Sequence, residues 1–313
     1  MSMGAAKNRM DDKIKRRLMD VLSGMDIRLN ESMKNHTTFR IGGLADVMIV
    51  VRSADEILQI LRFGHEEAIP VTIMGNGSNL LVRDGGIRGI VVKIAEGMNQ
   101  VKFTNLHATA QAGARLTLFA RESIEKNLMG LAFAGGIPGT VGGAVFMNAG
   151  AYGGCMADCL ESVTYIDEHI QMQTRIMESG DMGYRTTFFS QKTYIVTEAC
   201  FRFQRDFDKA ARTAFEQNNA LRKQKQPIEM PSAGSTFKRP EGHFAGKLIQ
   251  EAGCQGMRVG EAQVSPKHAG FIVNTGEASA KDIMALMEEV KRRVFENSGV
   301  KLELEVRIVG EEE

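Results

Sequence analysis

The chain lacks a surplus of either charge. Its 313 residues include 39 lysines and arginines against 38 acidic residues, which gives a formal net charge of +1. Proteins that bind nucleic acid or an anionic membrane over a broad surface carry a basic excess. We therefore expect neither of these partners, and any site for an anion must be a local one.

Cysteine is also scarce, and the residues present are poorly spaced for metal binding. Cys155, Cys159, Cys200 and Cys254 form no paired Cys-x-x-Cys set, whereas structural zinc sites draw their ligands from such short, fixed spacings. The N-terminal sequence has no apolar signal core. We therefore expect no metal, reduced thiols and a cytoplasmic location.

No stretch has the composition of a membrane span. The residues from Leu128 to Ala157 carry no charge and are numerous enough to cross a bilayer. They are interrupted by Pro138, Asn148 and many glycines, so a lipid-facing helix is not expected. We interpret this stretch as a loop that holds a ligand with its backbone.

Strand and helix patterns alternate near the start of the chain. Ala45–Val51 and Ile90–Ile94 are rich in β-branched residues, as strands are. Ser53 begins a capping box that predicts a helix immediately after the first of these strands. Further along, Ser279 and Asp282 form a capping pair that predicts a helix reaching Phe295.

A short glycine-containing segment follows the strand predicted at Pro70–Met74. Its sequence is Gly75-Asn76-Gly77-Ser78-Asn79. Glycine lets the backbone approach an anion closely, and successive N–H groups can surround it. A tight turn without any ligand explains this segment equally well.

A second segment, Gly135–Gly143, is more informative because it holds five glycines in nine residues. Ordering each glycine costs about 0.5–1 kcal/mol relative to alanine. Apolar neighbours such as Phe133 and Val145 indicate that the segment is buried. A flexible surface loop is the alternative, but burial favours close approach of the backbone to a ligand.

Taken together, the two segments resemble the FAD-binding domain of the vanillyl-alcohol-oxidase-like superfamily. This resemblance implies that both contact the FAD diphosphate. No histidine lies between Gly75 and Arg83, so we expect non-covalent FAD. The residues assigned to the cofactor are Gly75, Asn76, Gly77, Ser78, Asn79, Gly135, Ile137, Pro138, Gly139, Thr140, Gly142 and Gly143.

Six further motifs narrow the resemblance to the enolpyruvoylglucosamine reductases. They occur in that family's order and extend the match from about Thr37 to Gly310. The chain is similar to the shorter form of the family, because the stretch from Gly183 to Pro231 has no room for an extra substrate-covering loop. The motifs are Met147–Gly154, Gly183–Arg185, Pro231–Lys238, Phe244–Ile249, Val264–Asn274 and Leu304–Arg307.

The resemblance implies an α+β protein of three domains. Residues 1–96 and 97–209 would be the two α/β subdomains that hold FAD, and residues 210–302 would cover the substrate. The strand at 303–313 would return to the first domain. We expect a monomer.

The implied reaction is the NADPH-dependent, FAD-mediated reduction of UDP-N-acetylglucosamine enolpyruvate to UDP-N-acetylmuramate, a step of peptidoglycan precursor synthesis. Hydride addition to the enolpyruvyl double bond leaves a carbanion beside a carboxylate, which a fixed cation or a neutral acid stabilises. By resemblance, Arg185 supplies the cation, Ser235 donates the proton and Glu305 is the catalytic glutamate. As a donor, Glu305 must stay protonated, so we expect burial to raise its pKa.

The substrate contacts implied by the family fit this chain less closely. Either Lys225 or Lys223 would meet the UDP diphosphate, and the sequence leaves both open. Arg239 replaces the asparagine, and His268 the glutamine, that many members have, and a packing histidine is an alternative role for His268. The residues assigned to the substrate are Tyr184, Lys225, Lys238, Arg239 and His268.

Two other functions compete with this interpretation. The first is a different FAD oxidoreductase of the same superfamily, such as an alcohol oxidase. The second is a nucleotide-binding module without activity. The set Ser235, Lys238 and Glu305 would have no role in the first. The presence of Arg185, Ser235 and Glu305 argues against the second.

Overall fold

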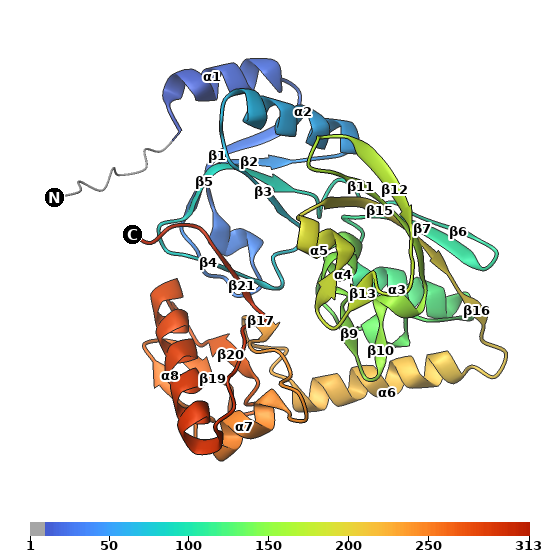
Figure 1. Cartoon of the computed structure of the whole chain (residues 1–313), viewed down its shortest axis with the longest axis vertical. Helices are drawn as coiled ribbons and strands as arrows, with labels where there is room; N and C mark the ends of the chain where they lie inside the picture. Colours follow the sequence, from blue (N-terminus) through green and yellow to red (C-terminus); the bar gives the residue numbers. More distant parts are fainter. Residues whose placement is uncertain (1–9) are drawn as a thin grey trace.

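The structure, a computed structural model, describes residues 10–313. Its first region is a four-stranded sheet in the order β1-β2-β5-β3, in which β1 is antiparallel and the others are parallel. Helices α1 and α2 lie beside this sheet (Figure 1). The elements are α1 (Asp12–Val21), β1 (Asp26–Ser32), η1 (Met33–His36), β2 (Leu44–Val50), α2 (Ala54–Glu66), β3 (Val71–Met74), β4 (Leu80–Val82) and β5 (Ile87–Lys93).

The second region is built on a five-stranded antiparallel sheet in the order β12-β11-β15-β7-β6. Its larger elements are β6 (Val101–Thr104), β7 (His107–Gln111), α3 (Leu116–Glu125), α4 (Val141–Met147), β11 (Leu160–Ile166), β12 (Met172–Ile176), α5 (Phe188–Lys192) and β15 (Ile195–Arg202). Its short elements are β8 (Leu128–Met129), η2 (Ala132–Ala134), β9 (Gly150–Ala151), β10 (Gly154–Cys155), η3 (Met156–Asp158), β13 (Met182–Gly183), β14 (Thr186–Thr187) and β16 (Gln204–Arg205).

The interpretation of residues 128–157 as one long loop is wrong. This stretch contains α4, the β9–β10 hairpin and two short 3-10 helices. Helix α4 forms because the Thr140 hydroxyl accepts a hydrogen bond from the Gly143 N–H at 3.4 Å, which caps the first turn. Val141 and Val145 are buried in the core. The helix ends at Asn148, whose left-handed backbone closes the last turn.

The third region is a four-stranded antiparallel sheet, β17-β20-β19-β18, with helices packed beside it. Ser279 and Asp282 cap α8 reciprocally, as the sequence predicts. Helix α6 is long and runs along one side of the second region before the chain enters this sheet (Figure 1). The elements are α6 (Ala210–Lys225), β17 (Ser232–Ser235), α7 (Ala245–Glu251), β18 (Arg258–Val259), β19 (Ala262–Val264), β20 (Phe271–Asn274) and α8 (Ala280–Ser298).

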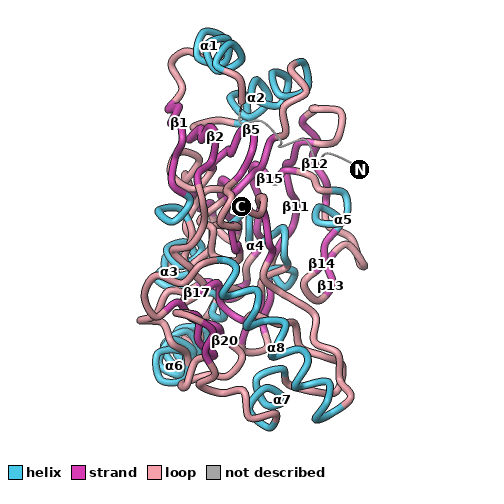
Figure 2. The backbone as a smooth tube through the Cα atoms, turned by 90° about the vertical axis from the view of Figure 1, so that its left-hand side faces the viewer, coloured by secondary structure: helices cyan, strands magenta, loops and turns pink. Residues whose placement is uncertain are grey.

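The last strand, β21 (Arg307–Val309), leaves the third region and pairs in parallel with β4 of the first region. Just before it, Leu304 forms a bridge with Phe237. Residues 303–309 therefore run between the first and third regions (Figure 1). Figure 2 shows β1, β2 and β5 of the first region toward one end of the molecule and α7 and α8 of the third toward the other.

The cores of the regions are shared. One apolar cluster includes Val47 and Ile49 of the first region with Phe119 and Phe201 of the second. Another brings Phe39 of the first region against the third. These mixed sheets and helices confirm the α+β class, while the boundaries at 96/97, 209/210 and 302/303 stay predictions.

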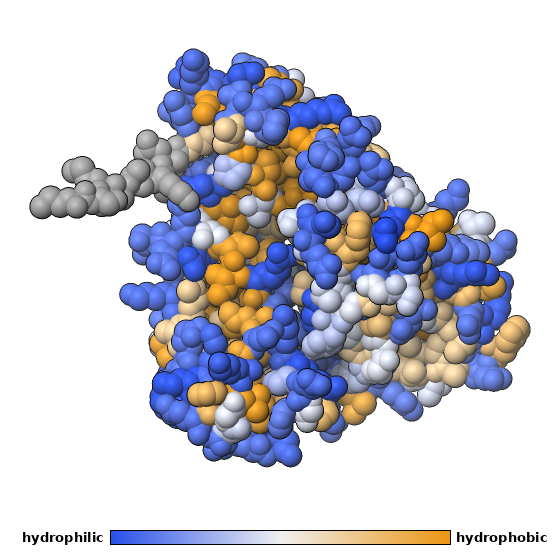
Figure 3. All heavy atoms as spheres, in the orientation of Figure 1, coloured by the Kyte–Doolittle hydropathy of each residue, from blue (hydrophilic) through white to orange (hydrophobic). Residues whose placement is uncertain are grey.

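In the face drawn in Figure 3, hydrophilic side chains border the apolar ones. Within residues 10–313, none of the helices combines the length and the apolar character needed to cross a membrane.

Candidate active site

An ion pair between Arg185 and Glu305 lies where the second region meets the C-terminal segment. The Arg185 Nε donates to Glu305 Oε1 at 2.7 Å, although 120 residues separate the two in sequence. Their side chains are 17% and 13% exposed. Water screens such a shielded pair less than a surface pair, so the attraction between the two charges is stronger than it would be at the surface.

Arg185 is held in an unfavourable backbone conformation. It lies in the turn between β13 and β14, with a φ of 55°. A non-glycine residue with such a positive φ costs about 1–3 kcal/mol and persists only where its surroundings fix it. Here its guanidinium donates to the carbonyls of Asn148 at 3.4 Å and Gly150 at 3.2 Å as well as to Glu305.

Asn148 is a residue whose role the sequence did not reveal. Besides its carbonyl contact with Arg185, its side chain donates to the Gly183 carbonyl at 2.9 Å and accepts from the Ala157 N–H at 3.1 Å. It is buried. Asn148 thus ties the end of α4 to the turn that carries Arg185. Its place as a polar residue within the uncharged stretch from Leu128 to Ala157 is the signal that could have pointed to it.

Glu305 is fixed from both sides by its backbone. Its N–H donates to the Thr236 carbonyl at 2.9 Å, and its carbonyl accepts from the Asn79 side chain at 3.0 Å. Ser235, the residue before Thr236, ends β17. The structure therefore places the backbones that carry Ser235 and Glu305 side by side.

The pKa of Glu305 is raised above its ordinary value. Burial is the largest cause, because it disfavours the charged carboxylate, while Arg185 and then Lys238 act in the opposite direction. The direction is the one expected from the sequence. A carboxyl group with a raised pKa can hold a proton at higher pH than an exposed glutamate.

The segment Gly75–Asn79 leaves its backbone donors available. Within residues 10–313, no backbone N–H from 75 to 79 has a hydrogen-bond acceptor, whereas the carbonyls of Gly77 and Asn79 accept from Thr38 and Arg307. Gly77 has a φ of +60°, and a Cβ there would lie 2.2 Å from the His36 carbonyl oxygen, so only glycine fits. Consecutive free N–H groups of this kind suit an anion.

The segment Gly135–Gly143 uses its donors differently. The N–H groups of Val141 and Gly142 donate to the carbonyls of Ala114 and Ala112, both at 2.8 Å, and that of Gly143 donates to Thr140. A Cβ on Gly142 would lie 2.6 Å from that of Ala112. At this end of the segment, the glycine at 142 is explained by close packing within the protein.

The other end of the same segment packs on α6. A Cβ on Gly135 would lie 2.3 Å from the ring of Phe215, and one on Gly136 would lie 2.4 Å from the Arg222 side chain. Asn218 donates to the Ala132 carbonyl at 3.3 Å. Residues 215, 218 and 222 share one face of α6, and their spacing of three and four residues is the sequence signal for such a face.

The two glycine segments meet at their middles. The Asn76 side chain donates to the Pro138 carbonyl at 2.6 Å. A Cβ on Gly75 would touch the Thr140 hydroxyl at 2.4 Å, and one on Gly139 would lie 3.3 Å from the Ser78 hydroxyl. Ile137, between them, packs against the core.

This arrangement fits a dinucleotide such as FAD. The free N–H groups of residues 75–79 can donate hydrogen bonds to a diphosphate, and Ser78 and Gly139 lie beside these groups. Gly142 and Gly143 belong to a capped helix whose N–H groups already have acceptors. Contact of Gly135, Gly142 and Gly143 with a cofactor stays a prediction.

The candidate substrate residues Tyr184 and Arg239 lie together. The Tyr184 hydroxyl accepts from the Arg239 N–H at 3.0 Å, and the Arg185 guanidinium lies 5.1 Å from the Tyr184 ring. The Arg239 guanidinium lies 4.1 Å from the exposed Phe244 ring. A continuous series of contacts therefore runs outward from Glu305 to Phe244.

Within residues 10–313, no hydrogen bond or ion pair joins the remaining substrate candidates to the Arg185–Glu305 pair, although Lys238 lies near enough to Glu305 to lower its pKa. Lys238 pairs with Glu303 at 3.2 Å. His268 accepts from the Gly270 N–H at 3.2 Å, and burial lowers its pKa. Lys225 is exposed at the end of α6, and the carbonyl of Lys223 accepts from Lys267 at 3.0 Å.

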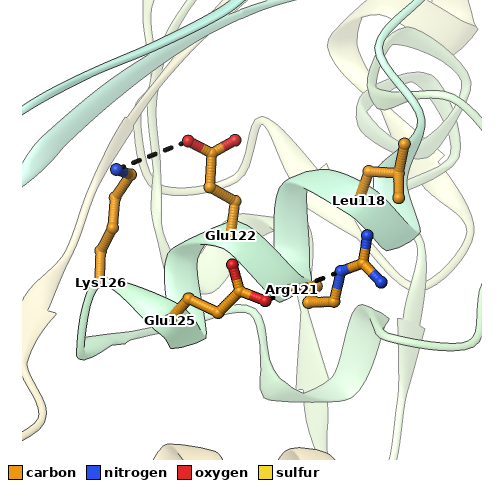
Figure 4. A pocket seen from close by; sticks show the side chains of 5 residues that line it. All are labelled: Leu118, Arg121, Glu122, Glu125 and Lys126. Atoms are coloured by element: carbon orange, nitrogen blue, oxygen red, sulfur yellow. Dashed lines mark ion pairs between the residues drawn. The ribbon is translucent and has the colours of Figure 1, made fainter.

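A surface depression elsewhere has no comparable chemistry. It lies on α3 and is lined by Leu118 and four charged residues (Figure 4). Those charges pair with one another, Arg121 with Glu125 at 3.9 Å and Lys126 with Glu122 at 3.6 Å. In the part of the chain that the structure describes, no cluster of histidine, cysteine or acidic residues suits a metal ion.

Comparison with known proteins gives a consistent result. Residues 45–169 match the model of an FAD-binding domain, and residues 226–309 match the C-terminal domain of UDP-N-acetylenolpyruvoylglucosamine reductase. A curated protein of that name from Clostridium novyi is 45% identical over 96% of this chain and 97% of its own length. One from Clostridioides difficile is 44% identical over 94% and 97%.

A solved structure agrees with the sequence relatives. The UDP-N-acetylenolpyruvylglucosamine reductase of Thermus caldophilus superposes with a TM-score of 0.77 at 35% identity. The alignment covers 91% of this chain and 98% of that one.

Proposed function

Because this chain belongs to the UDP-N-acetylenolpyruvoylglucosamine reductase family, we propose that it reduces UDP-N-acetylglucosamine enolpyruvate to UDP-N-acetylmuramate with NADPH and FAD. The observation that supports this most strongly is the shielded Arg185–Glu305 pair beside Ser235 and next to a glycine segment with free N–H groups. The reaction supplies a precursor of peptidoglycan. We place it in the cytoplasm and expect a monomer.

Some residues bind the cofactor or the substrate, and others stabilise the charge that develops during the reaction. Bound FAD, once reduced by NADPH, would supply the hydride for the enolpyruvyl double bond. Gly75–Asn79 offers N–H groups to the cofactor diphosphate, and Ser78 and Gly139 lie beside them. Tyr184 and Arg239 line the approach for the nucleotide sugar.

Arg185 stabilises the charge that develops on the substrate carboxylate. Its planar guanidinium can hold a carboxylate with two parallel N–H donors, which lysine cannot do. The carbonyls of Asn148 and Gly150 hold it in place before the substrate arrives. Preorganised charge of this kind lowers a barrier by several kcal/mol, commonly about 3.

Ser235 donates a proton to the carbon next to the carboxylate. A serine hydroxyl is a weak acid, so it serves only because the carbanion is strongly basic. Burial raises the pKa of Glu305, and in its protonated form this residue would add a neutral donor to the same charge. The Glu305 backbone bond to Thr236 keeps the two residues adjacent.

The test is NADPH oxidation by the purified yellow protein, with and without the enolpyruvyl sugar. We expect oxidation that depends on this substrate and collapses in Ser235→Ala while FAD stays bound. Oxidation without the substrate would indicate an oxidase relative. No oxidation by the FAD-bound wild type would indicate an inactive nucleotide-binding module.

A further inference from the structure

Thr38 joins the first region to the third through both its backbone and its side chain. Its hydroxyl donates to the Ser232 carbonyl at 2.6 Å, and its own carbonyl accepts from the Ser232 N–H at 3.1 Å, although 194 residues separate the two in sequence. A hydrogen bond is effective only within a narrow range of distance and angle. Two such bonds in opposite directions therefore fix Ser232, the first residue of β17, against Thr38.

The same residue contacts the segment proposed to hold the cofactor, Gly75–Asn79, which we call the cofactor segment. The Thr38 N–H donates to the Gly77 carbonyl at 3.3 Å. Gly77 packs so closely on the chain before Thr38 that an added Cβ would lie 2.2 Å from the His36 carbonyl oxygen and 3.0 Å from the Thr37 Cα. Thr38 thus bonds to the cofactor segment on one side and to β17 on the other.

The chain around Thr38 is anchored to the first region by His36. This side chain is buried, and its two ring nitrogens contact Glu31 at 2.7 Å and Lys93 at 2.8 Å. Lys93 is buried as well, and in the sheet it pairs with Met74, the residue before the cofactor segment. Because buried polar groups are costly to leave without partners, this network keeps the neighbouring backbone in one place.

Strand β17 ends at Ser235, the proton donor of the proposed reaction. Thr38 fixes the first residue of this strand, and the Glu305 N–H fixes the residue after its last by donating to the Thr236 carbonyl at 2.9 Å. Ser235 lies between these two attachments. Displacement of a reacting group by about 1 Å can reduce a rate roughly 100-fold, so the placement of β17 has a large effect on proton donation.

We propose that Thr38 is a positioning residue that fixes β17, and with it Ser235, relative to the cofactor segment. This proposal rests on the proposed function, because Ser235 has a role only in that reaction. Thr38 acts through Ser235 and needs no contact of its own with the substrate. It therefore affects transfer to the substrate, which needs Ser235, and leaves the reduction of FAD by NADPH unchanged, because that step does not need Ser235.

The first test measures the two half-reactions separately by stopped flow, as the loss of flavin absorbance with NADPH and its return with the nucleotide sugar. Thr38→Val keeps the shape of the side chain and removes the donor to Ser232, whereas Thr38→Ser retains this donor. We expect Thr38→Val to slow reoxidation by the sugar about tenfold or more, and to leave flavin reduction unchanged. Thr38→Ser should resemble the wild type in both steps.

Thr197→Val is the matched control for loss of a hydroxyl donor. The Thr197 hydroxyl donates to the Thr164 carbonyl at 3.0 Å, between β15 and β11 of the second region and away from β17. This variant should leave both rates unchanged. Equal slowing of the two half-reactions in Thr38→Val, or no slowing of reoxidation, would overturn the proposal.

The second test is independent of turnover and measures amide hydrogen exchange at Ser232 in apoprotein and FAD-bound protein. FAD should slow this exchange roughly tenfold in the wild type and in Thr197→Val, because Thr38 transmits the ordering of Gly77 to β17, and much less in Thr38→Val. If this pattern is seen and the reduced wild type is not reoxidised by the sugar, the connection through Thr38 stands and the proposed function fails. If FAD slows Ser232 exchange equally in the wild type and in Thr38→Val, the proposal is overturned.

Discussion

The two glycine segments differ in where their backbone donors go. In Gly75–Asn79 the N–H groups have no acceptor within residues 10–313, and the carbonyls of Gly77 and Asn79 anchor the segment to the protein. In Gly135–Gly143 the donors at the start of α4 are bonded to Ala112, Ala114 and Thr140. Several of its glycines are required by side chains packed against them.

This difference teaches that glycine density is a poor measure of ligand contact. Gly135–Gly143, which is richer in glycine, mainly packs against α6 and the core at the start of α4. Gly75–Asn79, which has fewer glycines, has the free N–H groups that suit an anion. Each segment also leads to one member of the ion pair. Asn79 holds the Glu305 carbonyl, and Asn148, at the end of α4, accepts from Arg185.

The largest expected effect is at the Arg185–Glu305 ion pair, to which both segments lead. Glu305→Ala removes a donor from the developing charge, which lowers kcat by about 10²–10³-fold, whereas Glu305→Gln keeps a neutral donor but cannot titrate. Because the pKa of Glu305 is raised, wild-type activity that needs its proton falls as the pH rises through that raised value. A pH profile of kcat should show this alkaline decline in the wild type.

In the Glu305→Gln profile the same decline should be absent. An unchanged alkaline decline would assign it to another group and remove the protonated role of Glu305.

The next effect is on the first segment. Gly77→Ala forces a side chain into a φ of +60° and toward the His36 carbonyl. The loss of folding stability should therefore exceed the roughly 1–3 kcal/mol that is typical of such backbone strain. We expect purified protein with little bound flavin, measured by visible absorbance per chain. Gly253→Ala is the control, because its φ is +68° with nothing within 4 Å. Equal flavin loss in both variants would show that close approach at Gly77 is unimportant.

A smaller effect is expected on the second segment. Gly142→Ala should destabilise the fold by about 1–3 kcal/mol through overpacking against Ala112. Denaturant unfolding of the apoprotein measures this loss. The FAD affinity of the folded fraction should stay close to wild type, and a selective loss of affinity would mean that Gly142 contacts the cofactor after all.

The smallest expected effect tests whether the second segment contacts the cofactor. Gly143 lies in α4, and the nearest atom to an added Cβ is the Thr140 hydroxyl at 3.5 Å. Gly143→Ala should therefore stabilise the apoprotein by up to about 1 kcal/mol, because alanine favours a helix. A decrease in FAD affinity in this variant would place the cofactor against the start of α4.

Local features of the fold were predictable from the sequence, and long-range ones were not. The capping residues Ser53 and Ser279 fixed the starts of α2 and α8, because capping depends on neighbours in the chain. Helix α4 was missed because Gly142 and Gly143 disfavour a helix in isolation, and burial of Val141 and Val145 overrides that preference.

The same distinction between local and long-range features applies to the candidate site. The resemblance pointed to Arg185, Ser235 and Glu305, but no spacing rule brings residues 120 positions apart into a hydrogen bond. The β13–β14 turn that carries Arg185 is too short for a strand pattern to show.

The most direct test of the difference between the two segments is amide hydrogen exchange, residue by residue, in apoprotein and FAD-bound protein. We predict that FAD slows exchange at residues 75–79 at least tenfold, while residues 141–143 are already protected and change little. Strong new protection at 141–143, with none at 75–79, would contradict the assignment of the cofactor diphosphate to the first segment.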